Sequence, residues 1–402
     1  MIVVVGSRVI GPMESYAAGF AAELDRLGYT RLSVAGQLRL AAHLSRWLAG
    51  EGLDVDALTP MIAGRFIAAR AAAGYTAHRS PKALAPVLGY LRGLGVAPLP
   101  TPVVAQGPVE VLLERYCCYL VGERGVGPAT ARGYAELVRP FVVSRATADA
   151  VDLAGLASAD VVGFVLAVSG ERSPKTAQRT VSALRSLLRF CHVQGLTGLL
   201  DTAVPSVANR RAGLPRFLEP AQVAALLASC DRTTVAGRRD FAMMTVMVRL
   251  GLRAGEVAAL GLDDLGWRSG EITILGKGPR RDRLPLPADV GEAVAGYLRH
   301  ARPPGAIDRQ VFVRVKAPHR GLTSAGVTQA VIAAGTRAGL GPISAHRLRH
   351  TAATGMLRAG APLTQVGQVL RHRRALTTQT YAKVDRDALR ALARPWPEAR
   401  HD

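Results

Sequence analysis

Two breaks divide this sequence into three blocks, and they limit the fold more than any other feature. The first break is Val96-Ala97-Pro98-Leu99-Pro100-Thr101-Pro102, whose prolines cannot continue a helix. The second begins near Val204-Pro205-Ser206 and runs into a basic stretch with Arg210, Arg211 and Arg216. A chain of 402 residues is also too long for one ordinary hydrophobic core. The sequence therefore predicts more than one domain.

The first two blocks have the apolar periodicity of helices. Between about residues 33 and 97 the apolar positions at helix spacing are Leu40, Leu44, Trp47 and Leu48, then Ile62, Phe66 and Ile67. The second block has three such faces, made by Val111, Leu112, Tyr116, Tyr119 and Leu120, by Tyr134, Leu137, Val138 and Phe141, and by Leu184, Leu187 and Leu188. Both blocks are therefore predicted to be helical.

These two blocks also resemble each other. Leu58 and Phe66 align with Leu156 and Phe164 at one offset, and Ser80-Pro81-Lys82 aligns with Ser173-Pro174-Lys175. The pattern is typical of a duplicated small helical module. A second interpretation stays open, because Ser-Pro before a basic residue is also a common helix start.

The third block is predicted to be mostly helical, with one β-hairpin. Glu271-Ile272-Thr273-Ile274-Leu275 has the composition of a strand, and Arg283-Leu284-Pro285-Leu286 has that of a returning strand. Gly276-Lys277-Gly278-Pro279 between them is a turn sequence. The hairpin would carry Lys277 at or beside its tip.

The charge of the chain favours a polyanionic partner. There are 51 Lys and Arg residues against 30 Asp and Glu, which gives a formal charge of +21. Excess cations neutralise phosphates and release counterions, so nucleic acid is the expected partner. The alternative is a solvated basic surface with no such partner. Aromatic residues make up only 5% of the chain, which argues against stacking of single-stranded bases and favours duplex DNA.

The cysteines and the N-terminus predict a soluble, intracellular protein. The four cysteines, Cys117, Cys118, Cys191 and Cys230, have no CxxC spacing, so a reducing cytoplasm is expected. The apolar run from Met1 to Val5 is too short for a signal sequence and has no basic flank. Nothing later in the sequence reaches the length of a membrane span.

Several side chains in the third block suit attack on a phosphodiester. Arg253 follows Gly251, which is expected to end one helix, and lies close to the start of the next, where its guanidinium and the helix dipole could bind a phosphate. Glu256 could support Arg253 or simply occupy the first helical turn. Lys277 lies between two glycines and could protonate a leaving oxygen. Each alone is also consistent with a surface ion pair or a solvated turn residue.

A second group of candidates lies in Ser344-Ala345-His346-Arg347-Leu348-Arg349-His350-Thr351. Residues three apart share a helix face, so His346 and Arg349 could act on one ligand while Leu348 faces the core. His346, His350 and His372 also suggest zinc, but the HExxH glutamate is missing and neighbouring arginines oppose a cation. No metal is therefore expected.

The last candidate is Tyr381, nine positions after His372. A tyrosine hydroxyl is a poor nucleophile at neutral pH and needs cations around the phosphate and an acid for the leaving group. The residues named above supply both. An isolated tyrosine is more often a packing residue.

Arg253, Lys277, His346-x-x-Arg349, His372 and Tyr381, in this order and with these spacings, resemble the phage integrase or tyrosine recombinase family. The match is densest from about residue 215 to 390. By this resemblance, Tyr381 forms a 3′-phosphotyrosyl intermediate and releases a 5′-hydroxyl. Arg253 and Arg349 bind the non-bridging oxygens, Lys277 protonates the leaving oxygen, His346 assists proton transfer and His372 bonds the phosphate. No cofactor is implied.

The resemblance also implies the architecture and the partners. The expected fold is mainly α, with SAM-like core-binding helices followed by a helical catalytic domain that contains a small antiparallel sheet. The expected domains are an extra N-terminal helical block at 1–105, for arm sites or as a duplicated SAM-like module, a core-binding domain at 106–205 and a catalytic domain at 206–402. The partners would be double-stranded DNA, a homotetramer formed on DNA from free monomers, and an accessory recombinase or DNA-bending protein. A cytoplasmic, nucleoid-associated enzyme of a mobile element, acting in integration or transposition, is expected.

One residue departs from the family pattern. Arg371 precedes His372 at a position where the family commonly has glycine. The tight backbone approach that glycine allows at this turn is therefore in question. The added cation is expected to face the polyanion. Two other functions remain open at this point. One is DNA relaxation of the type IB topoisomerase kind, and the other is a catalytically silent DNA-binding regulator.

Overall fold

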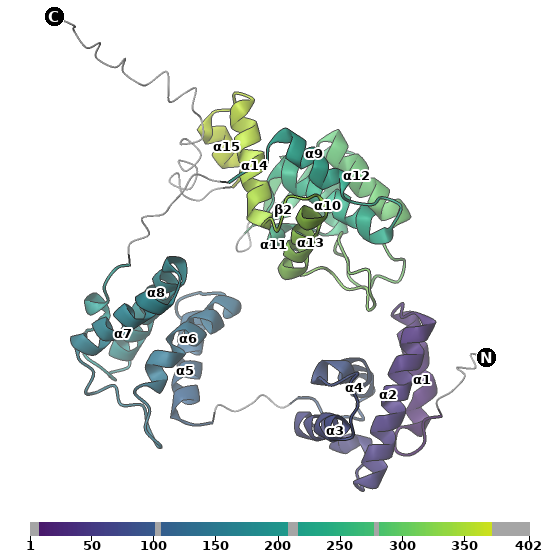
Figure 1. Cartoon of the computed structure of the whole chain (residues 1–402), viewed down its shortest axis with the longest axis vertical. Helices are drawn as coiled ribbons and strands as arrows, with labels where there is room; N and C mark the ends of the chain where they lie inside the picture. Colours follow the sequence, from purple (N-terminus) through teal and green to yellow (C-terminus); the bar gives the residue numbers. More distant parts are fainter. Residues whose placement is uncertain (1–7, 101–105, 208–215, 277–280, 372–402) are drawn as a thin grey trace, which may run out of the picture. The chain divides into compact units, whose positions relative to one another are not determined.

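The computed structural model describes residues 8–100, 106–207, 216–276 and 281–371. These residues form two compact units, one built from the chain up to residue 100 together with the chain from residue 214, and the other from residues 101–213. Figure 1 shows that both units are mainly helical. The mainly α fold with one small antiparallel sheet is confirmed.

The N-terminal block is helical, as predicted. Its elements are η1 (Glu14–Tyr16), α1 (Ala17–Arg26), α2 (Arg31–Gly50), η2 (Val55–Ala57), α3 (Pro60–Ala72), η3 (Pro81–Leu84) and α4 (Ala85–Gly93). Helix α2 starts where the Thr30 side chain accepts a hydrogen bond from the Ser33 amide. Leu40, Leu44 and Leu48 are buried in one apolar core together with Ile62, Phe66 and Ile67 of α3.

The second block has its own core. Its elements are α5 (Pro108–Gly122), α6 (Pro128–Val143), α7 (Ser158–Glu171), α8 (Pro174–Val193) and η4 (Asp201–Ala203). Leu112, Tyr116 and Leu120 are buried, but Val111 is 45% exposed. The prediction for Val111 was wrong because the buried face of α5 is made by Leu112, Leu113, Tyr116 and Leu120. Val111 lies about 140° to 200° around the helix from the last three of these residues, so its side chain points away from the core.

The third block has a hydrophobic core of its own. Its elements are α9 (Pro220–Ala228), α10 (Val235–Leu250), α11 (Ala254–Ala259), η5 (Leu262–Asp264), β1 (Leu265–Gly266), β2 (Glu271–Leu275), β3 (Arg281–Pro285), α12 (Ala288–His300), α13 (Ser324–Arg337), α14 (Ala345–Arg358) and α15 (Leu363–Val369). Helix α10 packs against α12 and α14, and its buried face carries Met243, Met244 and Met247.

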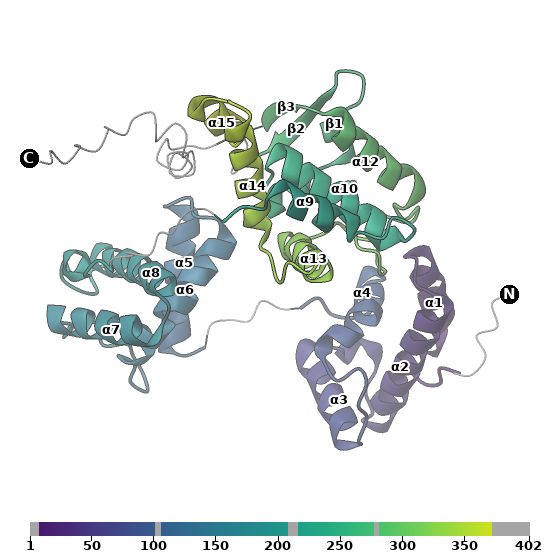
Figure 2. The same cartoon turned by 45° about the horizontal axis from the view of Figure 1, so that its top comes forward.

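The two strands of the predicted hairpin are present, but the second spans Arg281–Pro285 instead of residues 283–286. Most of the predicted turn, with Lys277, lies outside the described residues. Strands β2 and β3 pair antiparallel from Glu271 opposite Pro285 to Leu275 opposite Arg281. Ile272 and Ile274 are buried in the core. The two-residue strand β1, which was not predicted, pairs with β2 and completes a three-stranded sheet visible in Figure 2.

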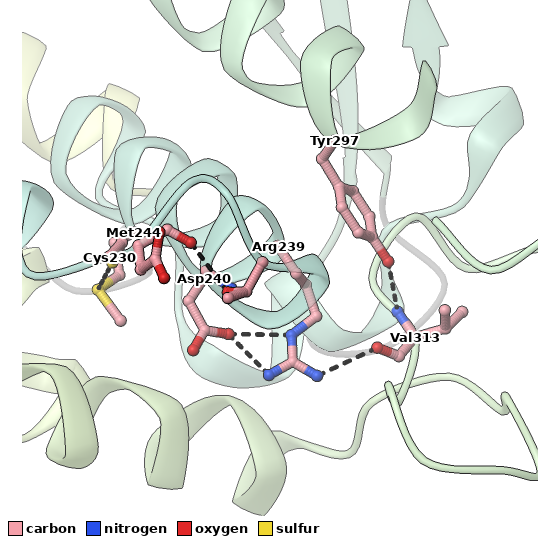
Figure 3. Close-up of polar contacts among 9 residues, drawn as sticks. Cys230, Arg239, Asp240, Met244, Tyr297 and Val313 are labelled. Atoms are coloured by element: carbon pink, nitrogen blue, oxygen red, sulfur yellow. Dashed lines mark hydrogen bonds and ion pairs between the residues drawn. The ribbon is translucent and has the colours of Figure 1, made fainter. Parts of the chain in front are cut away.

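A buried polar network holds the loop before α13 against two helices (Figure 3). Arg239 of α10 donates two hydrogen bonds to Asp240 Oδ1, at 2.7 and 2.9 Å, and one to the Val313 carbonyl at 3.3 Å. The Val313 amide donates to the hydroxyl of Tyr297 on α12 at 3.4 Å. The network thus links α10 and α12 to the backbone at Val313 and holds the two helices in place relative to this loop.

The structure also bears on cysteines and membrane insertion. All four cysteines are free thiols. Within the described ranges, none of the helices combines the length and the apolar character needed to span a bilayer.

Candidate active site

A glycine turn at the end of α10 positions the first candidate arginine. Gly251 has a φ of +61°, in the left-handed region, and ends the helix as predicted. A Cβ atom at Gly251 would lie 2.6 Å from Leu370 Cδ2 and 3.3 Å from Ala352 Cβ. Both the backbone conformation and the close packing therefore require glycine, and Arg253 follows two residues later.

Arg253 caps helix α11 and is bound to Glu256. Its amide donates to Glu256 Oε2 at 2.8 Å, and its guanidinium Nη1 donates to Oε1 at 2.6 Å. The Arg253 side chain is 45% exposed, whereas that of Glu256 is 7% exposed. Of the two roles considered for Glu256, the structure supports the one in which it holds Arg253.

Helix α14 carries the next two candidates. The Ser344 side chain caps the helix by accepting from the Arg347 amide. His346 is exposed, Leu348 is fully buried, and Arg349 is only 1% exposed. The expectation that Leu348 faces the core is confirmed.

The helix is tied to the start of the domain. The Leu218 amide donates to the Thr351 hydroxyl at 2.9 Å, and the Arg347 guanidinium donates to the Phe217 carbonyl. These contacts join residues more than a hundred positions apart and hold α14 against the segment that leads into α9.

Arg349 joins two of the site's segments. Its Nη1 donates to the Gly251 carbonyl at 2.7 Å, and its Nη2 donates to the Leu370 carbonyl. The turn before Arg253 and the turn after α15 are thereby held on one buried guanidinium. A planar guanidinium presents several donors in a rigid fork and suits such a bridge better than lysine.

His350 contacts the candidate His346. Their ring centroids are 4.4 Å apart and the rings are nearly perpendicular. Burial, together with the nearby His346 and Arg349, lowers the pKa of His350 to about 4. His350 is therefore neutral at pH 7, and it adds no positive charge beside Arg349.

This lowered pKa predicts acid sensitivity. An unfolded chain takes up a proton on His350 near pH 6.5, but the folded chain does so only near pH 4. The stabilisation that depends on a neutral His350 is therefore fully present above pH 6.5, and it is lost as the pH falls from 6.5 to 4. Between pH 7 and pH 5, we expect the wild type to lose about 1–2 kcal/mol more than His350→Gln in urea unfolding. The exposed-site control His192→Gln in α8 should follow the wild type, and equal losses for all three proteins would contradict the assignment.

Three predicted site residues lie outside the described ranges. They are Lys277, His372 and Tyr381. The structure thus brings together Arg253, Glu256 and Arg349, and places His346 on the exposed side of α14. In the part of the chain that the structure describes, no group of three His, Cys, Asp or Glu residues could hold a metal ion.

Comparison with known proteins identifies the chain. Residues 216–387 match the Phage integrase family, and residues 113–195 match the family described as Phage integrase, N-terminal SAM-like domain. The Sinorhizobium fredii protein named "Putative integrase/recombinase y4rA" is 39% identical over 96% of this chain and 95% of its own length. The tyrosine recombinase XerD of Listeria monocytogenes is 32% identical over 68% of this chain and 94% of its own.

The chain belongs to the phage integrase family of tyrosine recombinases. A crystal structure of the XerH site-specific recombinase bound to its palindromic difH substrate agrees in fold, with a TM-score of 0.56 at 21% identity, covering 84% of this chain and 95% of that one. The resemblance found in the motifs is thus confirmed. This tyrosine recombinase acts in site-specific DNA recombination by cutting and rejoining DNA strands.

The recombinase site contains one residue whose place sequence analysis did not predict. Arg371 was expected to face the DNA, but its side chain is 7% exposed and pairs with Glu256 at 2.6 Å. Its φ of +56° is a left-handed conformation, so the turn keeps the backbone shape that glycine would adopt. A non-glycine residue at a glycine position was the available signal, but its partner was 115 positions away.

Proposed function

We propose that Tyr381 is the nucleophile of this recombinase and that the site built around Arg253 and Arg349 holds the scissile phosphate. The tyrosine oxygen bonds to phosphorus while the bond to the 5′-oxygen breaks, which leaves a 3′-phosphotyrosyl link. Lys277 gives a proton to the leaving 5′-oxygen, and His346 assists removal of the tyrosine proton. His372 donates a hydrogen bond to the phosphate.

The proposal is supported by the convergence of separate chain segments. Arg349 joins the Gly251 turn, two residues before Arg253, to Leu370. Glu256 joins Arg253 to Arg371, the residue after Leu370. All six proposed site residues lie in the stretch that matches the integrase family. Cations held in place beside a scissile phosphate would stabilise the charge that develops as the tyrosine attacks, without a metal ion.

The chemistry also favours four subunits. Exchange between two duplexes breaks four strands, and each broken strand is held by one tyrosine. Each chain would supply a single Tyr381, so four copies are expected on the two duplexes, with a Holliday junction between the two pairs of cuts. We assign a homotetramer that assembles on double-stranded DNA from free monomers, with an accessory recombinase or DNA-bending protein as a further partner.

A mobile-element role is favoured over resolution of chromosome dimers. The relative y4rA matches 96% of this chain and therefore includes the N-terminal block, whereas the XerD relative matches only 68%. A block shared with an integrase/recombinase supports integration or transposition. An enzyme that integrates a mobile element into a chromosome would work at the nucleoid in the cytoplasm.

We assign the N-terminal block, residues 1–105, as a second copy of the core-binding module at 106–205. In the described residues each block contains four successive α-helices, α1 to α4 in the first block and α5 to α8 in the second. Buried residues in α2 have buried counterparts in α6 at one constant separation, and these pairs are Val34 with Ala131, Leu38 with Ala135, and Leu44 with Phe141. A shared pattern of buried positions supports a shared helical arrangement.

The N-terminal module presents a positively charged surface on α2. Arg39, His43 and Arg46 share one helix face by their spacing, and both arginines are exposed. Arg70 Nη1 donates to His43 Nδ1 at 3.0 Å, and its guanidinium lies 4.2 Å from the Tyr75 ring centre. Burial and the adjacent arginines lower the pKa of His43, so it stays an acceptor.

This surface fits a DNA backbone. Within the described part of the chain, Arg39, Arg46 and Arg70 form no ion pair with an acidic side chain. We expect Arg39→Ala/Arg46→Ala to weaken duplex binding and to reduce the slope of log affinity against log salt by about 1–2. Arg26→Ala, which removes a cation already paired with Glu23, serves as the matched control. Unchanged affinity and slope in the double variant would contradict DNA contact by this surface.

The recombination activity itself is tested on plasmids. Two copies of the DNA that flanks the coding region are placed on one plasmid and incubated with the purified full-length chain. Excision or inversion of the segment between the copies supports the proposal. Relaxation of supercoils without exchange would instead indicate a topoisomerase, and binding without breakage would indicate a silent regulator.

A further inference from the structure

Arg371 occupies a backbone conformation that must be held by its contacts. It follows helix α15 with a φ of +56°, and only one other non-glycine residue in the described ranges, His78, has a positive φ. Such a conformation is unfavourable for a residue with a long side chain and persists where the surroundings stabilise it. The contacts of the Arg371 side chain are therefore expected to stabilise this backbone conformation.

Those contacts lead to Glu256. Arg371 Nη2 donates to Glu256 Oε2 at 2.6 Å, and Nη1 donates to the Val369 carbonyl at 3.1 Å. Arg371 Nε is buried and has no hydrogen-bond partner among the described residues. The guanidinium is thus not placed to satisfy all of its own donors, and its principal contact is the carboxylate.

Glu256 lies between two arginines of different exposure. Its Oε1 accepts from Arg253 Nη1 and its Oε2 accepts from both the Arg253 amide and Arg371 Nη2. Arg371 and Glu256 are each 7% exposed, and Arg253 is 45% exposed. The two inner groups are fixed inside the domain, and Arg253 is the member that a ligand can reach.

The charges of this trio decide what Arg253 can do. Arg253 and Glu256 alone would form a neutral pair, and a neutralised arginine attracts a phosphate weakly. With Arg371 the trio carries one net positive charge. Because Arg371 also occupies Oε2, Glu256 meets the Arg253 guanidinium through Oε1 alone, which sets the orientation of that guanidinium.

We propose that Arg371 is a positioning residue that acts through Glu256 to keep Arg253 oriented and positively charged for the scissile phosphate. The proposal rests on the proposed function, in which Arg253 binds that phosphate. It assigns Arg371 no contact with DNA. Two other roles make different predictions, namely a purely structural tie between α15 and α11 and a direct DNA contact.

The test uses full-length variants on a nicked duplex that traps the covalent adduct. Arg371→Gln keeps a hydrogen-bond donor but removes the charge. We expect its adduct formation at saturating DNA to slow by about tenfold, less than the ~10²–10³ cost of removing a direct donor to the reacting oxygens. The apparent Kd for uncut duplex and its salt dependence should stay within about twofold of wild type.

A second variant separates charge from fold. In Glu256→Gln/Arg371→Gln both charges are removed, and the new amide oxygen can still accept from the Arg253 amide. We expect this double variant to recover most of the rate lost in Arg371→Gln. Arg371→Lys, which keeps the charge on a different donor, should fall between Arg371→Gln and wild type.

Each other outcome overturns the proposal. Wild-type rate in Arg371→Gln, with only a lower melting temperature, indicates a structural tie. A weaker Kd with a smaller salt slope indicates direct DNA contact. No recovery in the double variant, with the fold retained by circular dichroism, rejects the charge argument. If the wild type itself forms no adduct, the proposed function fails instead, which is a distinguishable result.

Discussion

Replacing Tyr381 by phenylalanine is expected to abolish the covalent protein–DNA adduct. The substitution removes one oxygen atom, and without it no phosphotyrosyl bond can form. Strand exchange should fall by about 10⁴-fold or more, as is usual when the nucleophile of a covalent mechanism is removed. Binding to the intact site should be retained, because the cations that attract the phosphates remain.

The measurement is a nicked duplex tiled from DNA around the coding region, incubated with each protein and resolved in SDS. An adduct with wild type and none with Tyr381→Phe would assign the nucleophile and locate the site. Tyr134→Phe is the matched control, since it removes a hydroxyl from a half-buried tyrosine in α6. An adduct in Tyr381→Phe equal to that of wild type would reject Tyr381.

Replacing Arg349 by alanine should damage both the fold and the reaction. Its guanidinium is 1% exposed and donates to the carbonyls of Gly251 and Leu370. Removal leaves both carbonyls without this donor and opens a cavity, so the free energy of unfolding should fall by about 3–5 kcal/mol. Adduct formation should fall by about 10³-fold even well below the melting temperature, because Arg253 and the turn after α15 lose their common anchor.

Urea unfolding and adduct formation would be measured side by side. Arg358→Ala is the control, because Arg358 lies on the same helix and pairs with Glu219 at the surface, where both side chains are 53% exposed. It should cost no more than about 1 kcal/mol. Equal losses in the free energy of unfolding for the two variants would show that the buried bridge made by Arg349 stabilises the fold no more than a surface ion pair does.

The elements that sequence analysis predicted best depend on local contacts. Strand β2 has the predicted bounds, since Ile272 and Ile274 alternate with polar residues over one short stretch. The end of α10 at Gly251 was also predicted, because a left-handed helix end favours glycine in any fold. Strand β1 was missed, since two residues carry too little pattern and its formation depends on pairing with β2.

For the site, sequence patterns supplied candidates and the structure supplied partners. Arg253, His346 and Arg349 were found through motif order, and Glu256 was left with two interpretations. The contact between Glu256 and Arg371 could not be inferred from spacing, because it joins residues 115 positions apart. The roles of Lys277, His372 and Tyr381 stay predictions, since these residues lie outside the described ranges.

The sequence by itself determined the helical blocks, the helix end at Gly251, the hairpin strands, the basic charge and the ordered residues that resemble tyrosine recombinases. These features follow from backbone preferences, caps and periodicity, which act within a few residues. Only the tertiary structure decided that Gly251, Arg349 and Leu370 meet, and that Arg371 turns inward to Glu256 instead of toward DNA. The direction of a long charged side chain depends on which buried partner the packed core brings within hydrogen-bond distance, and that partner is set by contacts distant in the chain.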